Sequence, residues 1–186
     1  KHLGTENNLR ILTDIYEYSR DKHTFLFNTA VQDIEVGADG GYVLVTEKGE
    51  RFTAPYLIAG PGRSGAEWFS KQCQKLGLEL INNQVDIGVR VELPATIFES
   101  ITDVVYESKL VYRTKQYGDQ VRTFCMNPYG HVVAENVEGI NTVNGHSYSD
   151  PKLQSENTNF ALLVAKHFSE PFKDSNGYGE SIARLS

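Results

Sequence analysis

A glycine-rich turn carries the strongest chemical signal in the sequence. Residues 60–65 read Gly-Pro-Gly-Arg-Ser-Gly, a Gly-x-Gly-x-x-Gly pattern. Glycines let the main chain turn tightly and approach a phosphate without a Cβ in the way. A helix that starts directly after such a turn adds free N–H groups and the positive end of its dipole. Arg63 could add a bidentate contact to a phosphate or a carboxylate.

The residues on either side of the turn predict a strand before it and a helix after it. Residues 56–59 are apolar enough for a central strand. Ser64 and Glu67 have the spacing of a capping box, and a helix is expected over residues 65–76, ending at Gly77. Taken alone, the pattern is also typical of a strand-to-helix turn that uses glycine for geometry only.

The place of the turn along the chain argues against an opening dinucleotide fingerprint. Such a fingerprint lies near the start of its domain and is followed by an acidic residue at the end of the second strand. Here Asn82 and Asn83 stand where that acid is expected. Several elements also precede the turn: a helix over residues 6–20 with Thr5 as its N-cap, a strand over residues 24–29, and a β-meander over residues 31–36, 42–46 and 51–53. We therefore expect residues 60–65 to close a domain.

Beyond Gly77 the pattern becomes that of antiparallel β structure. Residues 85–93 alternate between apolar and polar positions, and a short helix is expected over residues 96–104. Further strands are expected at residues 109–114, 121–126, 131–135, 142–146 and 160–167. The predicted fold class is α+β, with an α/β remnant over residues 1–77 joined to a mainly antiparallel β domain over residues 78–186 that is truncated at its C-terminus.

Segments spread over nearly the whole chain occur in the order found in one flavoprotein family. They are residues 2–5, 57–65, 86–92, 123–133 and 144–149. On these segments the chain resembles the middle part of the uncharacterised FAD-dependent, NAD(FAD)-utilising dehydrogenases, which are flavoproteins of the glutathione-reductase type. The family usually has Cys-x-Cys-Pro-Gly-Gly where this chain reads Cys-Met-Asn-Pro-Tyr-Gly from Cys125, and often has Met where His146 stands.

The resemblance implies an internal portion of an FAD-dependent oxidoreductase of unknown substrate, inactive by itself. FAD would be the cofactor of the full-length protein, NAD(P)H would be a co-substrate, and the remainder of the FAD-binding domain would be the partner of residues 1–77. The resemblance assigns to the FAD side Thr5, Val31, Ala59, Gly60, Pro61, Gly62 and Arg63. It assigns Arg90 to binding of a substrate carboxylate.

Three residues of the β-rich half have both a chemical and a structural interpretation. Cys125 could be a redox thiol that faces a flavin, but an inert buried thiol is favoured because no second cysteine is near it in the sequence. His146 could meet His131 across a ladder as an acid–base pair or a metal ligand, although a structural role is favoured. Arg90 and Glu92 share one face of an amphipathic strand, for which a solvated face or an ion pair is the default interpretation.

Composition narrows the classes of function. The chain has 186 residues and a net charge of -6, which argues against nucleic-acid binding. No apolar run is long enough for a membrane span. Cys73 and Cys125 are too few for a disulfide framework and lack metal-site spacing, so we expect a reducing cytoplasm and no metal.

Two alternatives to the flavoprotein interpretation remain. One is a nucleotide-binding α/β domain that uses residues 60–65 as its primary phosphate loop, and the other is a non-enzymatic β-rich interaction domain.

Overall fold

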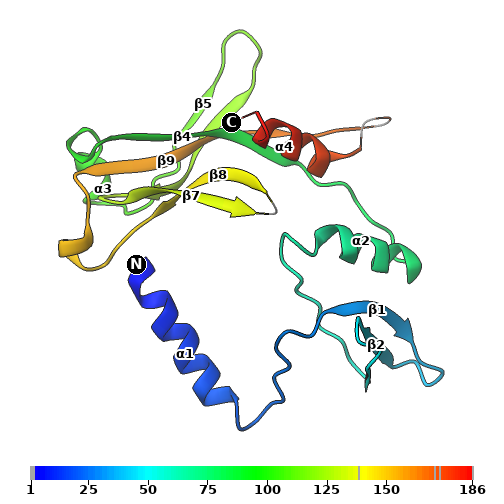
Figure 1. Cartoon of the computed structure of the whole chain (residues 1–186). Helices are drawn as coiled ribbons and strands as arrows, with labels where there is room; N and C mark the ends of the chain where they lie inside the picture. Colours follow the sequence, from blue (N-terminus) through cyan, green and yellow to red (C-terminus); the bar gives the residue numbers. More distant parts are fainter. Residues whose placement is uncertain (1–2, 138, 170, 172, 186) are drawn as a thin grey trace. The chain divides into compact units, whose positions relative to one another are not determined.

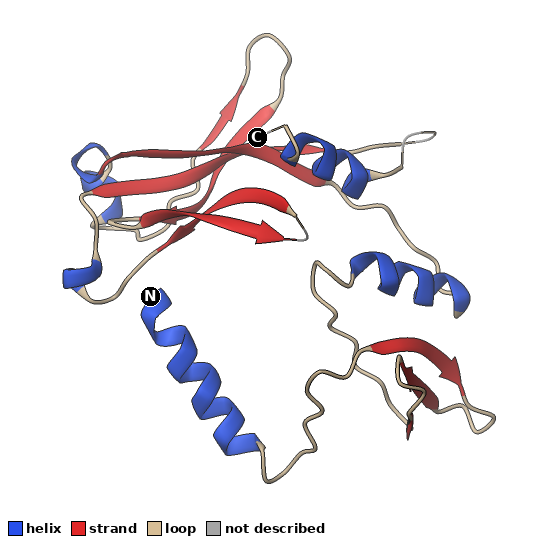
Figure 2. Cartoon of the chain, in the orientation of Figure 1, coloured by secondary structure: helices blue, strands red, loops and turns tan. Residues whose placement is uncertain are grey.

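The computed structural model describes residues 3–137, 139–169, 171 and 173–185. Contacts divide the chain into a smaller unit, Tyr18–Ile81, and a larger unit made of Lys1–Glu17 and Asn82–Ser186. We expected a boundary at residue 77, with the first helix on the N-terminal side of it. The contacts group most of that helix, up to Glu17, with the β-rich unit. Figure 1 traces the chain, and Figure 2 distinguishes its helices from its strands.

The smaller unit contains the predicted β-meander. Its strands β1 (Val31–Val36), β2 (Tyr42–Thr46) and β3 (Arg51–Ala54) pair antiparallel in the order β1-β2-β3. The connections are short, which antiparallel neighbours allow and parallel ones do not. The helix α2 (Ala66–Lys75) follows the glycine turn and ends where Gly77 takes a φ of 73°. The meander and the stop at Gly77 are thus confirmed.

Two predicted strands of the smaller unit do not form. Residues 24–29 and 56–59 have no ladder partner among the described residues. Ile58 is 97% exposed and Tyr56 is 86% exposed. A strand requires a partner for its N–H and C=O groups, and apolar composition alone does not supply one.

The predicted caps of both long helices are wrong. The N-cap of α2 is Gly65, which makes no side-chain cap, and Glu67 pairs with Lys71 one turn later. At the N-terminus the 3₁₀ turn η1 (Thr5–Asn7) precedes α1 (Asn8–Ser19), so Gly4 rather than Thr5 takes the cap position, with a φ of 85°.

The larger unit is built on a four-stranded antiparallel sheet of order β4-β9-β6-β5. Its strands are β4 (Val85–Pro94), β5 (Val111–Arg113), β6 (Gln120–Asn127) and β9 (Asn157–Lys166). The hairpin β7 (His131–Val137) and β8 (Ile140–His146) packs against this sheet (Figure 1). Short helical segments connect or end the strands: η2 (Ala95–Ile97), α3 (Glu99–Thr102), η3 (Pro151–Leu153) and α4 (Ser175–Ala183). The chain is therefore α+β with mainly antiparallel sheets, as predicted.

The interior of the larger unit is partly apolar and partly polar. Met126 is 2% exposed and Phe160 is 5% exposed, with the Phe160 ring 5.2 Å from that of Phe98. Polar side chains are buried beside them: Thr123, Asn127, Ser147, Thr158 and Asn159. A buried polar group costs free energy unless it is hydrogen-bonded, so a polar interior points to a specific arrangement. Among the described residues, no helix is long and apolar enough to cross a membrane.

Candidate functional site

The glycines of the turn differ in why they lack a side chain. A Cβ on Gly65 would overlap Pro61 and lie 2.9 Å from its carbonyl oxygen, so Gly65 serves local packing. Gly62 has a φ of 71°, which favours glycine. Gly60 has neither reason, because its φ is not left-handed and no described atom lies within 4 Å of the Cβ position. The space beside Gly60 is open.

That open space belongs to a cavity of about 680 Å³ in the smaller unit. Four residues assigned to the cofactor from sequence line it together: Val31, Ala59, Gly60 and Pro61. The rest of the lining is mainly apolar and comes from the meander, the segment before the turn and α2: Thr29, Ala30, Ile34, Leu44, Glu47, Leu57, Ile58, Gly65 and Trp68. Gly62 and Arg63 are not among the lining residues, and Thr5 lies in the larger unit.

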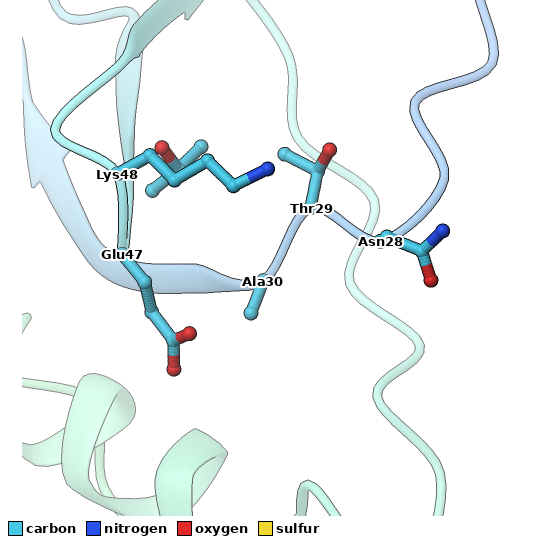
Figure 3. A pocket seen from close by; sticks show the side chains of 6 residues that line it. Asn28, Thr29, Ala30, Glu47 and Lys48 are labelled. Atoms are coloured by element: carbon cyan, nitrogen blue, oxygen red, sulfur yellow. The ribbon is translucent and has the colours of Figure 1, made fainter.

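A second hollow of about 360 Å³, which Lys48 also lines, shares Thr29, Ala30 and Glu47 with this cavity. Figure 3 shows the Lys48 side chain extending toward Thr29, whereas the Glu47 carboxylate points the other way. A cation therefore stands beside a mainly apolar cavity, an arrangement that suits a ligand with an apolar ring and a polar or anionic end.

Hydrogen bonds fix α2 against β1 and so hold the cavity wall. The Ile34 N–H donates to Gln72 Oε1 at 3.0 Å, and Trp68 Nε1 donates to the Gln32 carbonyl at 2.8 Å. Lys75 forms an ion pair with Asp33. The hydrogen bond from Lys75 holds the pKa of Asp33 below its usual value, against the opposing effect of burial.

The larger unit has a separate pocket of about 460 Å³. It brings together Cys125 and His146, two of the substrate candidates from the sequence, and its other lining residues are Leu3, Thr5, Asn8, Asn144 and Gly145. His131 does face His146 in the β7–β8 register, as predicted. Its ring, however, bonds the Leu153 carbonyl at 2.9 Å. Among the described residues no three His, Cys, Asp or Glu side chains are grouped to hold a metal.

Arg90 lies behind the wall of this pocket rather than on a solvated face. β4 pairs with β9 in unbroken register, so Arg90 and Glu92 lie on one face of the strand, but β8 covers Arg90 while Glu92 stays exposed. Its guanidinium donates to Asn159 Oδ1 at 2.6 Å and to the Cys125 carbonyl at 3.3 Å, with a longer contact of 3.4 Å to Asn144 Oδ1. The default of a solvated Arg90 is therefore wrong.

Cys125 is not buried, although the sequence favoured a buried thiol. It is partly exposed, lines the pocket and has a φ of 49° at the irregularity between Phe124 and Asn127. Its N–H donates to Glu107 Oε1 at 3.0 Å. A non-glycine residue in this region of φ is strained, and such strain concentrates at functional sites. Cys73, by contrast, is 6% exposed, as expected for a packing residue.

Sequence reasoning missed the asparagines around Arg90. Asn127, Asn144 and Asn159 connect the strands through their side chains. Asparagine is disfavoured in strands, so three of them in predicted strands or at their ends were a usable signal. Nearby, burial raises the pKa of Tyr106, which a hydrogen bond with Ser147 partly offsets.

Comparison with known proteins gives little beyond this geometry. No family model matches the chain, and no curated protein matches it. A solved structure of a salicylate hydroxylase in complex with its substrate has 12% sequence identity and a TM-score of 0.43, over 95% of this chain and 42% of that one. The chain thus spans less than half of that protein's length, and a likeness of this size carries no argument about function.

Proposed function

We propose that the chain is an internal part of an FAD-dependent oxidoreductase, with the smaller unit supplying one wall of the FAD site. The observation that carries the proposal is the convergence of Val31, Ala59, Gly60 and Pro61 on one cavity. These residues come from the meander and from the glycine turn, so the sequence order alone did not require them to meet.

The residues at the cavity fit a flavin nucleotide. Apolar walls suit aromatic rings, and Lys48 lies in the adjoining hollow where an anionic group would be placed. Gly60 lacks a side chain for no reason found in the described chain, which is explained if a bound group approaches its backbone closely. The Val31 backbone would lie near the adenine, and Gly62 and Arg63 would lie near the pyrophosphate end.

Apolar surface around the cavity supports the same proposal. Ile58 and Tyr56 are almost fully exposed directly before the glycine turn. Contiguous exposed apolar surface marks a contact with another group or segment. A flavin, and the remainder of an FAD-binding domain, would cover it.

FAD would supply the redox chemistry, and NAD(P)H is the proposed redox partner. This chain's own contribution is to hold and orient the cofactor and to exclude water from one side of it. The larger unit, which has its own pocket, would bind the substrate.

The test is flavin occupancy of the native polypeptide that contains this chain. We expect it to purify with flavin absorbance, or to gain it on reconstitution with FAD. Gly60→Val should lower flavin occupancy without unfolding the protein, since a Cβ at this position has no described atom within 4 Å. Ser64→Val is the matched control, because Ser64 is exposed and does not line the cavity.

Two outcomes would overturn the proposal in favour of its rivals. A native polypeptide that stays colourless after exposure to FAD would favour a non-enzymatic interaction domain. Tight binding of NAD(P) by this 186-residue chain alone, abolished by Gly60→Val, would favour residues 60–65 as a primary phosphate loop.

A further inference from the structure

Three polar side chains form a row on one face of the larger unit's sheet. Arg90 of β4, Asn159 of β9 and Asn127 of β6 lie on successive strands in the order β4-β9-β6. Arg90 donates to Asn159 Oδ1 at 2.6 Å, and Asn127 Nδ2 approaches the same oxygen at 3.4 Å. Asn127 is 4% exposed and Asn159 is 0% exposed, so the row is an interior feature.

Gly145 of β8 lies directly on this row. A Cβ at Gly145 would overlap Asn127 Nδ2, Asn159 Oδ1 and Arg90 Nη1 together. The other side of Gly145 lines the pocket of about 460 Å³. Gly145, which has no side chain, therefore lies in contact with the guanidinium and also lines the pocket.

The row carries an unneutralised charge and unused donors. Every hydrogen-bond acceptor of Arg90 is neutral, and within the described part of the chain no carboxylate lies within ion-pair distance of it. Arg90 Nε and Asn159 Nδ2 are buried without an acceptor. A partly buried cation and unpaired buried donors both raise the free energy of the fold. An anion in the neighbouring pocket would offset the unneutralised charge.

Two lining residues connect Arg90 to the pocket. The Cys125 carbonyl and Asn144 Oδ1 both contact the guanidinium, and both residues line the pocket. Each of these two residues also donates a hydrogen bond to a carboxylate. Glu107 accepts the Cys125 N–H at 3.0 Å, and Glu135 accepts from Asn144 Nδ2 at 2.9 Å.

We infer that the pocket lined by Cys125, Asn144, Gly145 and His146 binds a small organic carboxylate, with Arg90 supplying the charge that attracts it. The pocket volume of about 460 Å³ suits a small molecule rather than a polymer. The inference stands on the larger unit alone, and it rests on the proposed function only in naming this carboxylate as the flavin's substrate.

Cys125 makes the pocket testable with two reagents of nearly equal size. Iodoacetate is an anion and iodoacetamide is neutral, and each alkylates a thiolate sulfur with loss of iodide. We expect the rate ratio of iodoacetate to iodoacetamide at Cys125 in the folded chain to exceed that in the urea-unfolded chain by at least about fivefold, which corresponds to about 1 kcal/mol. Peptide mass spectrometry separates Cys125 from Cys73, which is buried and reports unfolding.

Variants assign the preference to Arg90. Arg90→Gln should bring the ratio at Cys125 down to the unfolded value, and Arg90→Lys should keep part of it, because the charge remains but the planar fork is lost. Arg122→Gln is the matched control on the same sheet, since Arg122 already pairs with Asp86 at 2.6 Å. If Arg90→Gln does not fold, the wild-type ratio and its loss in high salt still decide the matter.

Competition identifies the ligand chemistry. Benzoate and acetate should slow alkylation of Cys125 by iodoacetamide, and inorganic phosphate should do so less. Equal ratios in folded and unfolded chain, or protection by phosphate alone, would overturn the inference. Neither reagent requires FAD. A negative alkylation result would therefore overturn the carboxylate pocket without touching the flavin proposal, and an absence of flavin would leave the alkylation result standing.

Discussion

The N–H of Ile34 donates to the side-chain oxygen of Gln72 at 3.0 Å, in the interior of the smaller unit. Ile34 is 2% exposed and Gln72 is 8% exposed. A helix glutamine thus satisfies a strand N–H that no ladder partner takes. Because β1 and α2 both line the cavity of the glycine turn, this bond holds two of its walls together.

Replacing this glutamine should weaken the smaller unit. Gln72→Leu leaves the Ile34 N–H buried and unpaired, which should lower the free energy of unfolding by about 1–3 kcal/mol. Trp68 is the chain's only tryptophan and donates to the adjacent Gln32 carbonyl, so its fluorescence in urea reports this unit. Gln74→Leu, at an exposed position of the same helix, should change the midpoint little. Equal effects of the two substitutions would contradict the role of Gln72.

The Asp33–Lys75 pair should make the smaller unit sensitive to acid. Because Lys75 lowers the pKa of Asp33, the pair contributes its full stabilisation at pH values above the ordinary pKa of an aspartate. This stabilisation is lost as the pH falls through the lowered pKa of the folded state. The effect should be at most about 1 kcal/mol, since both side chains are partly exposed. Trp68 fluorescence during urea unfolding at several pH values measures it.

Asp33→Asn is the variant that isolates this pH dependence. It should remove the acid-dependent part of the unfolding free energy and reduce stability at neutral pH. Asp14→Asn, on the exposed face of α1, is the control for loss of a negative charge. An unchanged pH profile in Asp33→Asn would show that other carboxyl groups dominate acid unfolding.

Replacement by alanine should lower the stability of the chain at Gly145 but not at Gly60. Gly145→Ala places a methyl group onto the buried Asn127–Asn159–Arg90 row and should cost about 1–3 kcal/mol. Gly60→Ala meets no described atom at an ordinary φ, so the flavin-free chain should be unchanged or up to about 1 kcal/mol more stable. Urea unfolding monitored by circular dichroism measures the effect of Gly145→Ala. Urea unfolding monitored by Trp68 fluorescence measures the effect of Gly60→Ala. If Gly145→Ala left the free energy of unfolding unchanged, the side chains of Asn127, Asn159 and Arg90 would have to be able to move away from the added methyl group.

Phe160 should be the main apolar anchor of the larger unit. It is 5% exposed and its ring packs on Phe98, so Phe160→Ala should cost about 3–5 kcal/mol. Phe124, on the neighbouring strand β6, is 47% exposed and lies with its ring 5.1 Å from the Arg122 guanidinium. Phe124→Ala should therefore cost about 1 kcal/mol or less. Urea unfolding monitored by circular dichroism compares the free energies of unfolding of the two variants. Similar losses in both would show that Phe160 is not the main apolar anchor.

The sequence predicted elements that are stabilised by near neighbours in the chain. The meander over residues 31–54 has short glycine-containing turns, and each strand pairs with the next one. The two predicted strands that failed, at residues 24–29 and 56–59, are as apolar as real strands but have no partner among the described residues. The capping box predicted at Ser64 fails in another way, because Gly65 takes the N-cap position of α2 and makes no side-chain cap.

By itself, then, the sequence determined the turn glycines, the meander and the stop of α2, because local sterics and nearest-neighbour pairing fix them. Only the tertiary structure decided that Arg90 faces inward, that Cys125 lines a pocket and that Gly145 contacts the Arg90 guanidinium and lines the same pocket. These residues come together because β4 and β6 both pair with β9, far along the chain, and because a hairpin then packs across that sheet. β4 keeps an unbroken register with β9, so Arg90 and Glu92 share one face, and only the packing of β8 over part of that face buries Arg90, which strand composition does not reveal.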